Sequence, residues 1–385
     1  MASTARFTIS CPTRVIFGNG AAADLAMALP RHAKTVALVT GASGIASAPL
    51  LEGLRRSGFA VTQINCTGEP SVVSINAALD SLAGSRPDVV VACGGGSVID
   101  TGKVLAFLLS YDLSMQEDFD QFDVALLAQP SSIPCIALPT TAGTGAEVTA
   151  NAVVFVQSKM AKISLRGRAL NPTVAIVDPS LMKTGPAAVV LQSGLDAITQ
   201  VIEAYTSVAA TPFSDRLSGP SIEIGLKALR GVVEGNDAAA WNDLAWVSLT
   251  SGMALANAGL GAAHGLAAVV GGRYNAPHGA LCGRFLVPVL RRNLMMASPG
   301  SIAHQRHLEC IDVVSRVFSP KDGMDRLAGL AGWIDDSALP RLADWGVDPA
   351  GFDDLAEDAV QASSSKKNAV PLSIEDFVQI LKEAH

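Results

Sequence analysis

The spacing of apolar residues divides the chain into two parts with different periods. In the first part, short runs rich in β-branched residues alternate with segments of helical spacing, which is typical of a parallel sheet with crossover helices. From about Gly185 onward the short runs stop, and apolar residues recur at helical spacing over long segments. The pattern predicts strands at 35–40, 60–65, 88–93, 133–139 and 173–178, and helices at 193–207, 219–235 and 239–261.

The two periods predict two domains. We expect an α/β domain with a Rossmann-like parallel sheet at 1–182 and an all-helical domain at 183–385. The length of 385 residues favours this division, because a single core seldom extends over so long a chain. The proline-containing segment 171–186 is the predicted junction.

Composition narrows the class of protein. Apolar residues make up 49% of the chain and charged residues 16%, which allows large buried cores and argues against disorder. The net charge of −7 offers no basic surface for nucleic acid. The six cysteines show no CxxC spacing, the N-terminal stretch lacks a signal-peptide core, and no apolar run is long enough to span a bilayer. We therefore expect a soluble, cytoplasmic protein with no nucleic-acid or membrane partner.

A glycine loop is the strongest motif of the first domain. In "DVVVACGGGSVIDTGK" a buried strand runs into Gly94, Gly95 and Gly96, and Ser97 then opens a helix. The free N–H groups of a helix N-terminus favour a phosphate, and glycines let the backbone come close to it. The alternative is a tight turn in which Ser97 is the N-cap and Asp100 completes a capping box, and both interpretations can hold together.

A second loop, "LPTTAGTGAEVT", follows another predicted strand and carries hydroxyl groups at Thr140, Thr141 and Thr144. Both loops lie at the carboxyl ends of strands, where open α/β sheets bind nucleotides. The first domain is therefore predicted to bind a nucleotide with these two loops.

Two histidines, His264 and His278, enclose an apolar, glycine-rich segment of the second domain. Either one alone is most simply a buried core histidine, but imidazole is also a common metal ligand, and this pair lies on two elements joined by a turn. Asp196 and Gln200 are four residues apart, on one face of a predicted helix, and offer two further ligands. These four residues form the candidate metal site.

Six motifs follow one another between about Arg14 and Pro288. They are "RVIFGNGA", "GGGSVIDTGK", "LPTTAGTGAEVT", "NPTVAIVDPSLM", "GLDAITQVIEAY" and "HGLAAVVGGRYNAPHG". In this order they resemble the motifs of the iron-containing (group III) alcohol dehydrogenases. The resemblance implies a dehydroquinate synthase-like architecture, with the active site in the cleft between a nucleotide-binding domain and a helical metal-binding domain.

The resemblance also implies a set of metal ligands. The family holds its metal, here expected to be one Fe2+ or Zn2+, with an Asp, a His one turn later and two further His. Asp196, His264 and His278 match this pattern, and Gln200 replaces the first His. Ala268 stands where the family often has a histidine of the proton relay, so the resemblance assigns no general base.

The cofactor implied by the resemblance is NAD or NADP. Its contacts carry over to Gly95, Gly96, Ser97, Thr140, Thr141 and Lys162, and Thr144 belongs to the same threonine loop. Gly41 stands where NAD-preferring members carry an acid for the ribose 2′-hydroxyl. Since glycine does not repel a 2′-phosphate, we expect the protein to accept both NAD(H) and NADP(H).

The function implied by the resemblance is hydride transfer between NAD(P)(H) and a small alcohol, aldehyde or ketone, in a homodimer or higher homo-oligomer. One alternative is a metal-free reductase similar to the maleylacetate reductases. Another is a nucleotide-binding protein without turnover. The retention of Asp196, His264 and His278 weighs against both alternatives.

Overall fold

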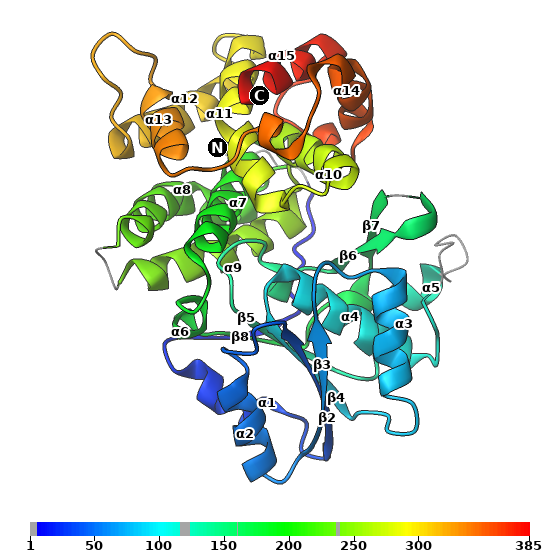
Figure 1. Cartoon of the computed structure of the whole chain (residues 1–385). Helices are drawn as coiled ribbons and strands as arrows, with labels where there is room; N and C mark the ends of the chain where they lie inside the picture. The colour runs from blue at the N-terminus through cyan, green and yellow to red at the C-terminus, as the bar shows by residue number, and fades with distance from the viewer. Residues whose placement is uncertain (1–5, 116–123, 160, 236–238) are drawn as a thin grey trace. The chain divides into compact units, whose positions relative to one another are not determined.

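The structure, a computed structural model shown in Figure 1, describes most of the chain: residues 6–115, 124–159, 161–235 and 239–385. It forms two compact units, and the first, an α/β unit, spans Cys11–Gly185. The second, helical unit spans Pro186–His385 and includes the N-terminal segment up to Ser10. This segment belongs to the helical unit because the Ser10 N–H donates to Asn257 Oδ1 at 2.8 Å and the Ser10 carbonyl accepts from Asn257 Nδ2 at 3.0 Å.

One parallel sheet of six strands is the centre of the α/β unit, as far as its described residues go. The strand order is β1-β8-β5-β4-β2-β3. The strands are β1 (Arg14–Phe17), β2 (Thr35–Gly41), β3 (Ala60–Cys66), β4 (Val89–Gly94), β5 (Cys135–Pro139) and β8 (Val174–Val177). The predicted α/β fold is confirmed, and the five predicted strands correspond to β2, β3, β4, β5 and β8.

Helices cover both faces of the sheet. The helices of this unit are α1 (Leu25–Ala28), α2 (Ala48–Arg56), α3 (Val72–Ser81), α4 (Gly96–Ser110), α5 (Val124–Leu127) and α6 (Pro179–Met182). In β4, Val89 and Val91 belong to the same core as α1 and α2, whereas Val90 and Ala92 belong to the core that contains α3 and α4. Alternate side chains of one strand therefore fill two separate cores, which explains the continuous apolar runs in the sequence.

The strand order places a topological switch point between β2 and β4. β3 pairs with β2 on one side and β4 pairs with it on the other, so the loops after β2 and β4 lead to helices on opposite faces. Gly41 ends β2 and Gly94 ends β4. Open α/β sheets bind their ligands at the carboxyl ends of strands at such a point.

An antiparallel hairpin, which the sequence analysis does not anticipate, follows the threonine loop. It consists of β6 (Asn151–Val156) and β7 (Ala161–Arg166). Its buried residues Ala152, Val154 and Val156 recur at every second position and join the core around α3 and α4. The hairpin thus extends that core beyond the sheet.

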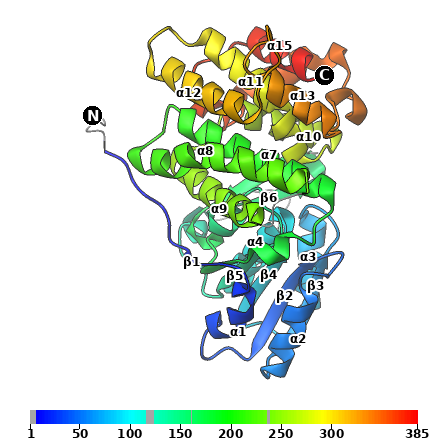
Figure 2. The same cartoon turned by 90° about the vertical axis from the view of Figure 1, so that its left-hand side faces the viewer.

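The helical unit contains long helices that pack on one another. Its helices are α7 (Ala187–Thr206), α8 (Pro212–Val233), α9 (Ala240–Ala258), α10 (Ala262–Tyr274), α11 (His278–Met296), α12 (Ile302–Val317), α13 (Ala328–Asp336), α14 (Phe352–Gln361) and α15 (Ile374–Ala384). α7 packs against α8, α9 and α11, and Figure 2 shows α7 and α8 side by side. The three helices predicted for this region are confirmed within α7, α8 and α9.

The predicted helix at 239–261 ends earlier than expected. α9 stops at Ala258 because Gly259, with a φ of 73° and a ψ of −168°, adopts an extended conformation that glycine tolerates, and α10 then begins at Ala262. In the part of the chain that the structure describes, no single helix is long and apolar enough to cross a membrane. α9 and α10 pass that test only as a pair, and the chain bends by 100° between them.

Candidate metal centre and cofactor loops

One face of α7 carries several buried polar residues, and the longest side chains among them are those of Asp196, Gln200 and Glu203. Asp196, Gln200 and Glu203 follow one another at intervals of about one helical turn, so their side chains lie on the same side of the helix. All three are buried, with exposed fractions of 5% or less. Buried charged side chains need partners, and these lie on α10 and α11.

The two histidines of the sequence motif lie at the beginnings of two consecutive helices. His264 is in the first turn of α10, and His278 is the first residue of α11. Asn275, in a left-handed conformation with a φ of 51°, ends α10 and turns the chain toward α11. One turn after His278, Cys282 lies on the same side of α11.

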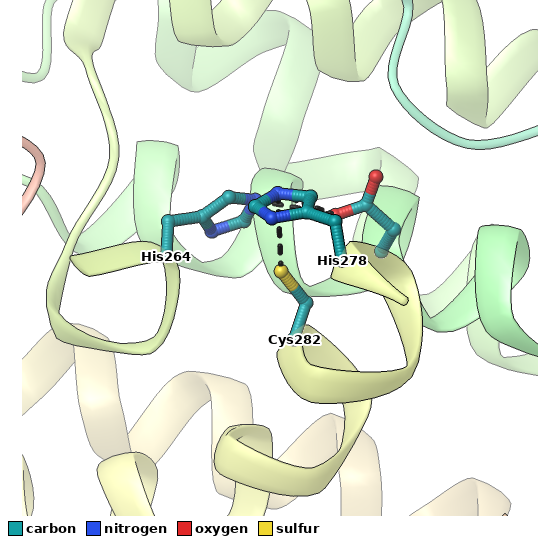
Figure 3. Close-up of side chains that lie close together, drawn as sticks. His264, His278 and Cys282 are labelled. Carbon is teal, nitrogen blue, oxygen red and sulfur yellow. Dashed lines mark hydrogen bonds and ion pairs between the residues drawn. The ribbon is translucent and has the colours of Figure 1, made fainter. Parts of the chain in front are cut away.

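Asp196, His264, His278 and Cys282 form a donor cluster, in which one potential ligand atom of each residue lies within 4.8 Å of those of the other three. The Oδ1 atom of Asp196 is 3.3 Å from Nε2 of His264 and 3.9 Å from Nε2 of His278. Figure 3 shows the sulfur of Cys282 below the ring of His278, with a distance of 3.5 Å between Sγ and Nε2. The donor cluster is buried except at His278, whose side chain is 40% exposed.

Two atoms of the donor cluster have unused hydrogen-bonding capacity. Within the described residues, Asp196 Oδ1 and His264 Nε2 are buried and have no hydrogen-bond partner, although they face each other. Buried polar atoms are normally paired, so two adjacent exceptions require an explanation. A cation between them satisfies both, because a carboxylate oxygen and an imidazole nitrogen are common metal ligands.

Glu203 orients His264. Its Oε2 atom lies 2.6 Å from Nδ1 of His264, and the carboxylate also accepts the backbone N–H groups of Gly261 at 2.8 Å and Ala263 at 2.7 Å. The carboxylate therefore fixes the proton on Nδ1 and leaves Nε2 as the nitrogen available to a metal. A carboxylate bonded to the second nitrogen of a ligand histidine is a recurrent feature of metal sites.

Gln200 does not present its oxygen to the donor cluster. Its Nε2 donates to Asp196 Oδ2 at 3.2 Å, and its Oε1 accepts from the hydroxyl of Ser251 at 2.8 Å. An amide NH2 group is a donor and does not bind a metal. In this arrangement Gln200 positions the carboxylate of Asp196, in contrast to the role of a metal ligand that the sequence assigned to it.

The charges of the donor cluster shift the pKa values of its members. Burial alone raises the pKa of Asp196, but the neighbouring His264 and His278 lower it below its usual value. Burial alone lowers the pKa of His264, but its neighbours Cys282, Glu203 and Asp196 raise it well above its usual value. Burial raises the pKa of the Cys282 thiol to about 12. The donor cluster thus favours a negative carboxylate beside a positive charge.

The glycine loop begins α4 without a side-chain cap. The N-cap is Gly95, α4 starts at Gly96, and glycine offers no side chain to cap the helix. Ser97 is therefore inside the first turn and is not the N-cap, which corrects the alternative interpretation of this loop. Because the cap residue has no side-chain acceptor for the N-terminal amides, these amides can bind an anion.

Asp100 also differs from its expected role in a capping box. One carboxylate oxygen accepts the N–H of Val153 at 2.9 Å, and the other lies 3.4 Å from Nζ of Lys103. The Lys103 ammonium is fully buried and donates to the carbonyl of Asn151 at 2.8 Å and to Thr149 Oγ1 at 3.1 Å. Asp100 and Lys103 thus connect α4 to the hairpin.

The threonine loop packs directly on the glycine loop. The N–H of Thr140 donates to the carbonyl of Gly94 at 2.9 Å. A Cβ atom on Gly96 would lie 3.0 Å from Thr144 Oγ1, and one on Gly95 would lie 3.4 Å from Thr141. The structure therefore brings these predicted contacts together at the carboxyl ends of β4 and β5.

The other two predicted cofactor contacts, Gly41 and Lys162, have different surroundings. At Gly41 a Cβ atom would meet only a methyl group of Val98, at 3.8 Å, so a side chain fits there. Lys162, on β7, forms an ion pair with Glu69, with 2.8 Å between Nζ and Oε2. Its charge is already paired in this structure, so Lys162 is a weaker candidate for a phosphate contact than the loop amides.

Comparison with known protein families identifies the family to which the chain belongs. The family model for iron-containing alcohol dehydrogenase matches residues 12–179, and the model for the C-terminal part of that family matches residues 190–385. The chain belongs to the iron-containing alcohol dehydrogenase family. It is therefore an enzyme, an oxidoreductase of the alcohol dehydrogenase type, as the sequence motifs predicted.

Curated relatives of this alcohol dehydrogenase cover nearly its whole length. A probable alcohol dehydrogenase of Escherichia coli K12 is 31% identical over 98% of this chain and 94% of its own length. An NAD-dependent methanol dehydrogenase of Bacillus methanolicus is 28% identical over 97% of this chain and 98% of its own. The predicted cofactors, NAD(H) with iron or another divalent metal, are confirmed at the level of the family.

Solved structures agree with this assignment. A crystal structure of 1,3-propanediol oxidoreductase has a TM-score of 0.86 and 27% identity, and covers 99% of this chain and 100% of its own. The iron-containing alcohol dehydrogenase of Thermococcus thioreducens has a TM-score of 0.84 and 26% identity, with coverages of 98% and 99%. The predicted order of an α/β unit followed by a helical unit is that of these proteins.

The donor cluster of this alcohol dehydrogenase fits the metal that the family implies. A buried carboxylate, two imidazoles and a sulfur atom converge on one point, and two of these ligand atoms, Asp196 Oδ1 and His264 Nε2, have no hydrogen-bond partner among the described residues. The sequence motifs predicted three of these four residues, Asp196, His264 and His278. Cys282 was missed, although its spacing of four residues from His278 on a helix was a usable signal.

Proposed function

We propose that Asp196, His264 and His278 hold the divalent metal of this alcohol dehydrogenase and that the enzyme interconverts a small alcohol with its aldehyde or ketone. The observation that supports this most directly is the pair of buried, facing atoms Asp196 Oδ1 and His264 Nε2, which have no hydrogen-bond partner among the residues described. His278 completes the set from the partly exposed side. We expect substrate to approach the metal on this side, because the side chain of His278 is partly exposed whereas the other ligands are buried.

When bound, the metal supplies Lewis acidity toward the substrate oxygen, and NAD(P) exchanges a hydride with the substrate carbon. The chain supplies the positions of the ligands. Glu203 fixes the ring of His264 with Nε2 toward the donor cluster, and Gln200, held by Ser251, fixes the second oxygen of Asp196. Rigid ligands keep the geometry constant through the reaction, which is how an active site avoids reorganisation during catalysis.

For the cofactor we propose that the pyrophosphate binds the N-terminal amides of α4 at Gly95, Gly96 and Ser97, with the hydroxyls of the threonine loop beside it. The absence of a side-chain cap at α4, within the described residues, supports this role. The space at Gly41 and the lack of an acid there support acceptance of both NAD(H) and NADP(H).

The chain lacks a histidine at the position of the family's proton relay. Ala268, at the position of the family's relay histidine, is exposed and has no ionisable group. We therefore propose that the proton exchanges with water at the exposed side of the donor cluster, next to His278.

The substrate we propose is a small primary alcohol or the corresponding aldehyde. The names of two relatives, a methanol dehydrogenase and a 1,3-propanediol oxidoreductase, support this size class. The cytoplasmic location and the homo-oligomer expected from the sequence stay predictions.

Chelation tests the proposed function. The purified enzyme is treated exhaustively with a chelator, its metal content is measured, and oxidation of NADH and NADPH is followed with a panel of small aldehydes and ketones. We expect activity to disappear with the metal and to return with Fe2+ or Zn2+. Full activity of a metal-free enzyme would instead support the metal-free reductase.

A further inference from the structure

The donor cluster contains a sulfur ligand that the sequence pattern did not assign. Cys282 is fully buried, and its Sγ lies 3.5 Å from Nε2 of His278. His278 and Cys282 are four residues apart on α11, so one helix offers two ligands to the same point. A lone buried cysteine is usually an inert core residue, but this one adjoins two buried atoms, Asp196 Oδ1 and His264 Nε2, that have no hydrogen-bond partner within the described residues.

The fourth ligand position is open to Cys282 because Gln200 does not fill it. The amide oxygen of Gln200 is occupied by the hydroxyl of Ser251, and its NH2 group faces Asp196 Oδ2. To become a ligand, Gln200 would have to give up both hydrogen bonds and turn its amide over. Cys282 needs no such rearrangement, since its sulfur is already within 4.8 Å of the other donors.

We propose that Cys282 is the fourth protein ligand of the metal, which makes the centre one carboxylate, two imidazoles and one thiolate. This inference rests on the proposed function, because it concerns the metal of the same site. On binding, the S–H bond breaks, the proton passes to water, and a bond forms between sulfur and the metal without any change of oxidation state. Gln200 is a positioning residue for Asp196.

A thiolate ligand changes which metal the site prefers. Sulfur is a softer donor than a carboxamide oxygen, and thiolates favour zinc over harder divalent ions. The carboxylate and the thiolate together also balance the charge of a divalent ion, which a buried site favours. We therefore expect this enzyme to prefer zinc or cobalt to Fe2+.

Cobalt substitution tests the sulfur ligand directly. The full-length protein is stripped of metal and loaded with Co2+, and its absorption spectrum is recorded together with its cobalt content. We expect one cobalt per chain and a near-ultraviolet charge-transfer band from sulfur to cobalt. In Cys282→Ser the band should disappear, and cobalt should bind about 100-fold more weakly. Loss of a residue that only supports a ligand already lowers metal affinity by up to about 100-fold.

Cys310→Ser is the matched control, because Cys310 is equally buried in the helical unit but lies outside the donor cluster. Its band should equal that of the wild type. X-ray absorption at the zinc edge of the wild-type protein gives a second test that does not depend on folding of a variant. A sulfur neighbour at about 2.3 Å supports the proposal, and a shell of nitrogen and oxygen alone contradicts it.

The outcomes separate this inference from the proposed function. If one cobalt binds per chain without the charge-transfer band, or if the band persists in Cys282→Ser, Cys282 is not a ligand, while the metal-dependent function stands. If the wild type binds no cobalt and remains active after chelation, both proposals fail.

Discussion

Two buried carboxyl groups, one in each unit, have pKa values that are shifted in opposite directions. Asp196 in the helical unit lies among two histidines, which lower its pKa although burial alone would raise it. Glu147 lies in the threonine loop of the α/β unit, where burial raises its pKa to about 7. Its Oε1 atom also has no partner among the described residues, but no cluster of metal donors surrounds it.

The difference shows that an unpartnered buried oxygen does not by itself indicate a metal site. Asp196 differs because three other potential metal ligands, which come from two helices, lie close to it. Glu203 orients one of these ligands, His264. Glu147 avoids the cost of burial by remaining protonated over much of the pH range, whereas Asp196 is kept charged by its neighbours.

The largest effect is expected from His264→Ala. The variant removes the nitrogen that faces Asp196, so we expect bound metal to be lost and kcat/KM to fall at least about 1000-fold, roughly 4 kcal/mol. The readouts are metal content and turnover of the same preparation. His307→Ala is the control, because His307 is also buried, and its Nε2 has no hydrogen-bond partner among the described residues, but it lies outside the donor cluster. Equal losses in both variants would indicate damage to the fold.

The second prediction concerns Glu147 and the pH dependence of stability. Its pKa in the folded protein is about 7, compared with 4.5 for an unperturbed glutamate. The folded state therefore binds the proton more tightly, and ionisation destabilises it progressively as the pH rises from about 4.5 to about 7. Relative to Glu147→Gln, the wild-type free energy of unfolding should fall by up to about 3 kcal/mol over this window.

Denaturant titrations at several pH values measure this difference. Glu52→Gln, at an exposed position of the same unit, is the control and should run parallel to the wild type. If the curves of the wild type and Glu147→Gln also run parallel, the pKa of Glu147 in the folded protein is close to its ordinary value of 4.5, and the prediction is wrong.

A smaller effect is expected from Glu203→Gln. The amide retains one acceptor oxygen but lacks the charge that orients Nδ1 of His264, so we expect metal affinity to fall about 10- to 100-fold. Competition with a coloured chelator measures the affinity. Glu223→Gln removes an exposed carboxylate of the same unit and should leave the affinity unchanged. An unaltered affinity in Glu203→Gln would show that Glu203 only caps α10.

The smallest effect is expected in the α/β unit. Gly41→Asp places a carboxylate where a 2′-phosphate would lie, and the site has room for it. The ratio of kcat/KM for NAD(H) over NADP(H) should rise about tenfold, roughly 1.4 kcal/mol. Gly41→Asn is the control of equal size without charge, and an equal shift in both variants would exclude an electrostatic cause. A wild-type preference for NADH beyond about 100-fold would also contradict the account.

The sequence predicted the fold well because its signals are local. Continuous apolar runs identified the buried strands, and glycines marked the loops at their ends. The hairpin of β6 and β7 was missed because its turn, near Gln157 and Lys159, lacks the glycine and asparagine residues typical of hairpins. The end of α9 depended on the conformation of Gly259, which the sequence alone leaves open.

The donor cluster was predictable in its residue types but not in its geometry. The positions of Asp196, His264 and His278 followed from the motifs, and helical spacing could have added Cys282 and Glu203. The orientation of Gln200 could not be predicted. It depends on the hydroxyl of Ser251, which comes from a different helix and accounts for the direction of the amide.

Anomalous diffraction from crystals of the metal-loaded enzyme tests the central claim most directly. Data collected at the absorption edge of the bound metal locate it without reference to activity. The account predicts one peak per chain, within about 2.0–2.3 Å of ligand atoms of Asp196, His264 and His278. A fully active enzyme whose crystals show no peak at these three residues, or a peak elsewhere in the chain, would contradict it.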